Sequence, residues 1–118
     1  MYLNCHSFFS FKFGTMSPEE LLLEAQRKGI SSIALTDINN TSGVLEFFHL
    51  APKYNIKPVA GIDFRNGVQQ RFIGIAKNID GFRELNSFLS HLLQNKIPVP
   101  ERAPAFEHAF VKIGRAHV

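Results

Sequence analysis

The chain has 118 residues, of which 45% are hydrophobic and 19% are charged, and this composition predicts one folded domain and excludes a disordered segment. Its formal net charge of +3 is small and its basic residues are scattered, so charge alone does not indicate nucleic-acid binding. A single cysteine, Cys5, allows no internal disulfide and fits a reducing, cytoplasmic compartment. The sequence shows neither a secretory signal pattern nor an apolar run of about 20 residues, so we expect no membrane contact.

The first third of the chain predicts a strand, a loop and a helix. Residues 1–5 are rich in strand formers, and residues 6–16 form an aromatic stretch that predicts a loop. Residues 17–20 combine a capping Ser, a Pro suited to the first helical position and a Glu that completes a capping box. Gly29 supplies the left-handed residue that ends the helix.

The middle of the chain repeats this pattern. An apolar run over 32–36 predicts a buried strand, and residues 37–40 predict a turn. A second helix is expected over about 41–51, and Pro52 should end or kink it. The apolar residues 57–62 predict a third strand.

After the third strand, the pattern changes from strand–helix alternation to a hairpin. Asn66-Gly67 is a hairpin turn signal and leads into a strand over 70–76. Asn78 or Asp80 can cap the helix that follows, and residues 106–112 predict a short final strand. The order is therefore βαβαβ, a hairpin strand and a helix, which predicts an α/β fold with parallel pairing, as a (β/α) barrel or an open sheet.

Polar residues follow the first three predicted strands. In parallel α/β folds, ligands gather at the carboxyl ends of the strands. His6, Asp37 and Asp63 stand there, and imidazole and carboxylate groups both bind divalent cations, so these residues could form a metal site. Spacing alone leaves open a turn or capping role for Asp37 and a surface role for Asp63.

Other chemistry has weaker signals. No Gly-rich phosphate-binding motif is present in the sequence. The four Phe within residues 8–13 are more typical of a core or an interface than of base stacking, because only Lys12 interleaves them.

Three segments together resemble the first three motifs of PHP domains, and most of all the PHP domain at the N-terminus of bacterial DNA polymerase III alpha subunits. These segments are residues 3–7 (LNCHS), 34–43 (ALTDINNTSG) and 56–63 (IKPVAGID). The strand and helix over 73–85 resemble those that follow in the same subunits, so that the similarity extends to about residue 112.

The resemblance implies a distorted (β/α)7 PHP barrel, of which this chain would hold the first βαβαβ units, a hairpin strand and a helix. Active PHP domains bind zinc or manganese through His-x-His in the first motif, Asp-His in the second and Glu in the third. This sequence has Asn4 and His6, Asp37 and Ile38, and Asp63 at those positions. Only His6 and Asp37 match, so we expect a degenerate, structural metal site with no catalytic residue and no cofactor in this chain.

The resemblance also implies a parent enzyme. That enzyme would be a cytoplasmic DNA-directed DNA polymerase, a nucleotidyltransferase with Mg²⁺ in a palm domain outside these residues. The partners would be the remainder of the polymerase chain, replisome subunits and, through the parent enzyme, DNA. The alternative is a metal-dependent PHP-family phosphoesterase or 3′–5′ exonuclease, which the missing His at positions 4 and 38 disfavours.

The last six residues differ in origin from the rest, in our interpretation. Residues 113–118 (IGRAHV) match the translation of a widely used sequencing adapter in the frame ATC-GGA-AGA-GCA-CAC-GTC. We therefore expect residues 1–112 to be the N-terminal part of a PHP domain, and residues 113–118 to be non-native.

Overall fold

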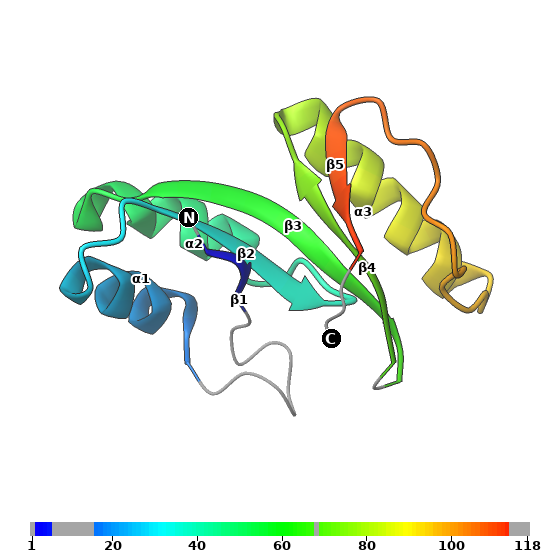
Figure 1. The fold of residues 1–118 in the computed structure, drawn as a ribbon, viewed down its shortest axis with the longest axis horizontal. Coiled ribbons are helices and arrows are strands. Elements are labelled where there is room, and N and C mark those ends of the chain that lie inside the picture. Colours follow the sequence, from blue (N-terminus) through cyan, green and yellow to red (C-terminus); the bar gives the residue numbers. More distant parts are fainter. Residues whose placement is uncertain (1, 6–15, 68, 114–118) are drawn as a thin grey trace.

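The computed structural model describes residues 2–5, 16–67 and 69–113 and confirms the predicted α/β fold (Figure 1). The elements, in chain order, are β1 (Tyr2–Cys5), α1 (Pro18–Arg27), β2 (Ser32–Ile38), α2 (Val44–Leu50), the 3-10 helix η2 (Ala51–Tyr54), β3 (Lys57–Asn66), β4 (Gln69–Ala76), α3 (Ile79–Gln94) and β5 (Ala109–Lys112). None of these helices has the length and apolar character of a membrane-spanning segment.

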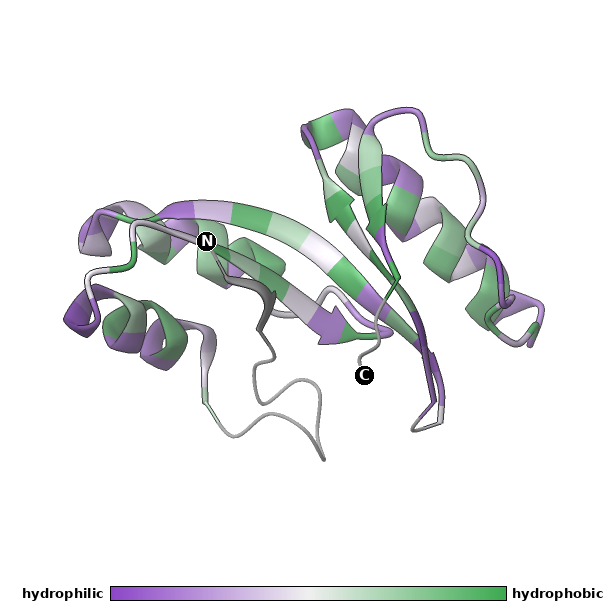
Figure 2. Ribbon diagram, viewed as in Figure 1, coloured by the Kyte–Doolittle hydropathy of each residue, from purple (hydrophilic) through white to green (hydrophobic). Residues whose placement is uncertain are grey.

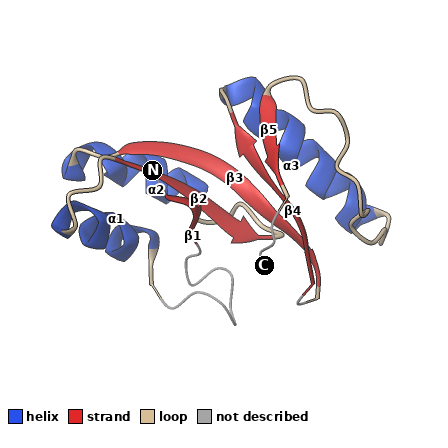
Figure 3. Cartoon of the chain, in the orientation of Figure 1, coloured by secondary structure: helices blue, strands red, loops and turns tan. Residues whose placement is uncertain are grey.

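The described strands form one sheet in the order β1-β2-β3-β4-β5. β1 pairs with β2, and β2 with β3, in parallel, as the strand–helix alternation predicts. β3 and β4 are antiparallel, which confirms the predicted hairpin, and β5 returns antiparallel to β4. The sheet bends along its width, with α1 and α2 near one end and α3 near the other (Figure 3).

The helix termini follow the local sequence. The Ser17 hydroxyl accepts from the Glu20 amide at 3.1 Å while the Ser17 amide donates to Glu20 Oε1 at 2.8 Å, so the predicted capping box is present. Gly29 has a φ of +72°, as expected of the residue that ends α1. α2 ends at Leu50, and Pro52 lies in η2, because Pro has no N–H to continue an α-helix.

The predicted carboxyl ends of β2 and β3 were wrong, and so were the starts of α2 and β5, which begin at Val44 and Ala109 rather than near residues 41 and 106. The turn expected over 37–40 begins later, because Asp37 and Ile38 pair with Ile62 and Asp63 as the last residues of β2. β3 likewise continues to Asn66. Asp37 and Asp63 therefore lie inside strands rather than in the loops after them.

The two faces of the sheet differ in what covers them. Helices cover one face. On it, Ile33 and Leu35 of β2 pack with residues of α1 and α2, and Ile62 and Phe64 of β3 pack with residues of α3. Since Leu35 is paired with Ala60, residues 33, 35, 60, 62 and 64 share this helix-covered face. The opposite face carries Ala34 with Val59, Ile73 and Ile75. Figure 2 shows the hydrophobic residues gathered on the strands and inner helix surfaces, and hydrophilic ones at the hairpin end.

Close backbone contact holds β5 near the start of α3. A Cβ built on Gly81 would lie 1.9 Å from the carbonyl oxygen of His108, the residue before β5. The Glu84 carboxylate accepts from the backbone amides of Glu107 at 2.9 Å and His108 at 2.6 Å. The return to β5 therefore depends on a residue without a side chain at 81 and a carboxylate at 84.

We expect Gly81→Ala to lower the free energy of unfolding by roughly 1–3 kcal/mol, because the new methyl group must push the His108 backbone away. Denaturant unfolding would measure this. Ser87→Ala, on the exposed side of the same helix, is the control and should change stability little. Equal midpoints for Gly81→Ala and Ser87→Ala would contradict the steric account.

A second prediction concerns pH. The two amides that donate to the Glu84 carboxylate hold its pKa below the ordinary 4.5, against a smaller opposing effect of burial. A carboxyl whose pKa is lower in the folded state stabilises the fold above its ordinary pKa, and this stabilisation is lost as pH falls through the lowered value. Wild type should therefore exceed Glu84→Gln in stability at neutral pH, and the difference should shrink as the pH falls below the ordinary 4.5 and through the lowered pKa of Glu84. Unfolding midpoints measured across this pH range test the prediction; a pH-independent difference would refute it.

Candidate functional site

The carboxyl end of β2 lies beside β3, at the end of the parallel strands where the sequence predicts a metal site. This end of the strands is called here the rim. The parallel register pairs Asp37 with Ile62 and Ile38 with Asp63. His6, the third predicted metal position, lies outside the described residues. The structure therefore places two of the three predicted positions.

Asp37 and Asp63 are neighbours along the rim but lie on opposite faces of the sheet. Residues paired across parallel strands have their side chains on the same face, and successive residues alternate. Asp37 thus shares the helix-covered face with Ile62, and Ile38 shares the other face with Asp63. The side chain beside Asp63 on its own face is the hydrocarbon of Ile38, where the resemblance to PHP domains would imply a His.

Asp63 is fully buried, at 0% exposure, so the surface role that the sequence left open for it is wrong. Arg65 Nε donates to Asp63 Oδ1 at 3.1 Å and Arg65 Nη2 donates to Oδ2 at 3.0 Å. Gln70 Nε2 lies 3.1 Å from Oδ1 and 3.0 Å from Oδ2. Both carboxylate oxygens therefore accept hydrogen bonds from protein donors.

A β-bulge places the Gln70 side chain next to the Asp63 carboxylate. Between Phe64 and Arg65 the register shifts, so that Phe64 pairs with Phe72 but Arg65 pairs with Gln70. Arg71 is the extra residue, and it moves Gln70 onto the face that holds Asp63 and Arg65. Alternation counted from the sequence without the bulge would have set Gln70 on the opposite face.

Asn39 connects the end of β2 to the same network. It has a φ of +50°, a left-handed conformation that Asn tolerates better than most residues. Its amide nitrogen Nδ2 donates to the Arg65 carbonyl at 2.8 Å, and its Oδ1 accepts from the Arg65 backbone amide at 3.0 Å. The Asn39 backbone amide donates to the Asp63 carbonyl at 3.0 Å. Asn39 therefore fixes the backbone on both sides of residue 64.

Asp37 has a different environment. It is 2% exposed and has an interaction partner. Beyond it, Asn40 stabilises the turn that leads to α2, because its Nδ2 donates to the Ile38 carbonyl at 3.2 Å and its Oδ1 accepts from the Ser42 amide at 3.1 Å. The turn role that the sequence allowed for Asp37 belongs to Asn39 and Asn40.

The described residues do not fit a divalent cation at Asp63. A cation there would have to displace the donors on both oxygens and would lie next to the guanidinium of Arg65. Ile38 supplies no ligand atom on that face. Within residues 16–67 and 69–113, no three His, Cys, Asp or Glu side chains converge in a way that could hold a metal ion.

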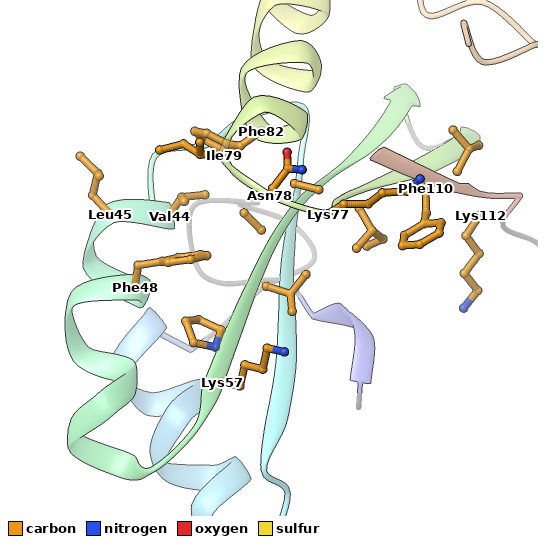
Figure 4. A pocket seen from close by; sticks show the side chains of 16 residues that line it. Val44, Leu45, Phe48, Lys57, Lys77, Asn78, Ile79, Phe82, Phe110 and Lys112 are labelled. Carbon is orange, nitrogen blue, oxygen red and sulfur yellow. The ribbon is translucent and has the colours of Figure 1, made fainter. Parts of the chain in front are cut away.

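A second feature is an apolar groove of about 900 Å³ that neither Asp37 nor Asp63 lines (Figure 4). α2, β3, β4, the first turn of α3 and β5 form it, and its charged lining residues are Lys57, Lys77 and Lys112. Lys77 Nζ lies 4.5 Å from the centre of the Phe110 ring. The groove borders the start of β3, because the described pairing of β3 with β4 begins only at Gly61.

The comparisons with known proteins agree on the family and on the fold. The model of the PHP domain family matches residues 3–112. DNA polymerase III subunit alpha of Buchnera aphidicola subsp. Acyrthosiphon pisum is 31% identical over an alignment of 100 residues that covers 80% of this chain and 9% of that protein. The same subunit of Ureaplasma parvum is 31% identical over 94 residues, 80% of this chain and 10% of that protein. The error-prone DNA polymerase of Mycobacterium bovis is 31% identical over an alignment of 98 residues that covers 75% of this chain and 9% of that protein.

Two solved structures share the fold. A protein from Bifidobacterium adolescentis assigned as a metal-dependent phosphoesterase has a TM-score of 0.59 and 19% identity over 76% of this chain and 32% of its own. An amidohydrolase from Chromobacterium violaceum, with bound sulfate and no metal, has a TM-score of 0.61 and 21% identity over 80% of this chain and 34% of its own. The chain thus spans about a tenth of the curated relatives and about a third of these structures.

Substitutions at Asn39 can separate its two contributions. Asn39→Gly keeps the left-handed backbone accessible and removes the two side-chain bonds to Arg65, whereas Asn39→Ala also adds backbone strain. We expect Asn39→Gly to destabilise by about 1–2 kcal/mol and Asn39→Ala by about 1 kcal/mol more. Urea unfolding would measure both. If Asn39→Gly is as stable as wild type, the side-chain bonds contribute nothing.

Proposed function

Since the chain belongs to the PHP domain family, we propose that it is the N-terminal part of the PHP domain of a replicative DNA polymerase, in which the PHP metal site has become structural. The bonding of Asp63 carries the second half of this proposal. A carboxylate held by Arg65 and Gln70 is already neutralised and is not available to a metal cluster. The predicted metal positions His6, Asp37 and Asp63 would then be residual.

Three relatives that carry polymerase names support the polymerase parent. In this proposal the parent enzyme is a nucleotidyltransferase that copies DNA with Mg²⁺ in a palm domain beyond these residues. Its partners are the remainder of its own chain, other replisome subunits and DNA, and it works in the cytoplasm. Residues 1–112 would serve as scaffold.

Exposed apolar surface supports the view that further chain packs here. Leu45, Ile79 and Phe110 are 84%, 67% and 61% exposed, and all of them line the groove at the start of β3. Single exposed apolar residues are ordinary, but a contiguous apolar groove is typical of a surface that another segment covers. We also propose that residues 113–118 are adapter-derived and that the natural chain continues past Lys112.

A metal-dependent phosphoesterase of the PHP family is the second candidate. The similarity to the Bifidobacterium adolescentis structure favours it, because the chain covers 32% of that protein and a short continuation would complete it. The bonded state of Asp63 disfavours it.

The complete reading frame distinguishes the two candidates. We expect resequencing of the locus to show on the order of a thousand further codons, as the relatives' lengths indicate, where the small phosphoesterase would need only roughly 150. A genuine stop codon after Val118 would refute the fragment proposal.

Metal analysis of the complete protein tests the structural role of the site. We expect no tightly bound zinc or manganese cluster and no hydrolysis of bis(p-nitrophenyl) phosphate. Two or more such ions per chain in the PHP domain, together with hydrolysis that Asp63→Ala abolishes, would establish the phosphoesterase instead.

A further inference from the structure

We propose that Arg65 takes the place of a metal ion as the counter-charge of Asp63, and that the resulting Asn39–Asp63–Arg65–Gln70 network, called here the rim latch, fixes the β3–β4 hairpin to the end of β2. This inference rests on the proposed structural role of the PHP metal site. It adds which residue replaces the cation and what the replacement does.

The buried Asp63 carboxylate needs a balancing positive charge. Asp63 is 0% exposed, and an ionised carboxylate removed from water needs a cation or strong donors to remain in the fold. In a metal site the bound ions supply the positive charge. Here the guanidinium of Arg65, whose side chain is 12% exposed, meets the carboxylate with one nitrogen on each oxygen. This two-point geometry is specific to Arg, because Lys offers only one charged nitrogen.

Strand geometry makes the pairing possible. Asp63 and Arg65 are two residues apart on β3, so their side chains lie on the same face. Gln70 reaches the same carboxylate from β4 because of the bulge at Arg71. The described part of the latch therefore draws its donors from the β2 terminus and the β3–β4 hairpin.

The network also connects the end of β2 to the β3–β4 hairpin. Arg65 is held through its backbone by Asn39 as well as through its side chain by Asp63. Asn39 follows directly after β2, so the network ties three consecutive strands of the sheet at one point. A metal ion that bridges strand ends would perform the same mechanical task.

The test is hydrogen–deuterium exchange of amides within residues 61–75 in the complete protein, read by mass spectrometry. Arg65→Met keeps the approximate length of the side chain and removes the guanidinium from the Asp63 carboxylate, while the Gln70 donor stays in place. We expect the exchange of this segment to accelerate at least tenfold in Arg65→Met. We expect Asp63→Asn/Arg65→Met to exchange more slowly than Arg65→Met, because the double variant no longer buries a carboxylate without its guanidinium partner.

Arg71→Met is the matched control. Arg71 lies on the same hairpin, but its nearest acidic oxygen is Glu101 Oε2 at 3.9 Å, and Glu101 is 88% exposed. This variant should accelerate exchange less than Arg65→Met does. Equal acceleration of exchange in Arg65→Met and Arg71→Met would overturn the counter-charge role. So would exchange in Asp63→Asn/Arg65→Met that is as fast as the separate effects of Asp63→Asn and Arg65→Met add up to.

A second measurement needs no Arg65 variant. Exchange of the 61–75 segment in wild type should be the same in MnCl₂, in ZnCl₂ and in EDTA. Slowing by either metal that disappears in Asp63→Asn would show that a cation, and not Arg65, balances this carboxylate. If the complete domain binds no metal cluster and yet shows no Asp63–Arg65 coupling, the rim latch fails and the proposed function stands.

Discussion

The register between β2 and β3 determines everything else at the rim. With Ile38 paired to Asp63, each residue of the second motif is assigned to one face of the sheet. A shift of one residue would bring Asp37 beside Asp63 on the same face and place two carboxylates together. Gly61 helps to fix this arrangement, because a Cβ there would lie 2.4 Å from the Gly74 carbonyl and 2.8 Å from the Thr36 side chain. The third motif therefore needs its Gly for the close approach of β4, whether or not a metal is present.

Given that register, the chemistry around Asp63 follows from the burial of its negative charge. A carboxylate at position 63 must be balanced, and a metal ion or a guanidinium can do so. The two solutions exclude each other, because a dication and Arg65 would compete for the same two oxygens and repel one another. Ile38 fits the second solution, since an apolar neighbour offers neither a competing ligand nor an unsatisfied polar group.

Local rules predicted the elements of this fold well. The capping box at Ser17, the end of α1 at Gly29, the end of α2 before Pro52 and the cap at Asn78 each depend on residues within a few positions. The lengths of β2 and β3 could not be predicted in this way. Asp37 and Asp63 are polar residues that favour turns by themselves, and only pairing with the neighbouring strand keeps them extended.

The candidate site was predicted only in part for the same reason. The sequence identifies Asp37 and Asp63 as rim residues, but their placement on opposite faces follows from pairing across strands. The roles of Arg65 and Gln70 had weaker signals still. In the sequence, Arg65 is one of several scattered basic residues that would be expected at the surface. Gln70 reaches Asp63 only because of a bulge, which the amino-acid composition does not predict. The i, i+2 spacing of Asp63 and Arg65 within a strand is the one signal that could have indicated the pair.

The hairpin also connects the rim to the question of what this chain belongs to. β4 pairs with β3 only from Gly61 onward and then passes into α3, so within the described chain the first residues of β3 have β2 as their strand neighbour on one side and the apolar groove on the other. An exposed strand edge beside an apolar groove is a surface that proteins usually cover. Further strands of a larger barrel would cover this edge. The open edge at the start of β3 in the described chain and the small share of its relatives that the chain spans both support the proposal that these residues are part of a longer polypeptide.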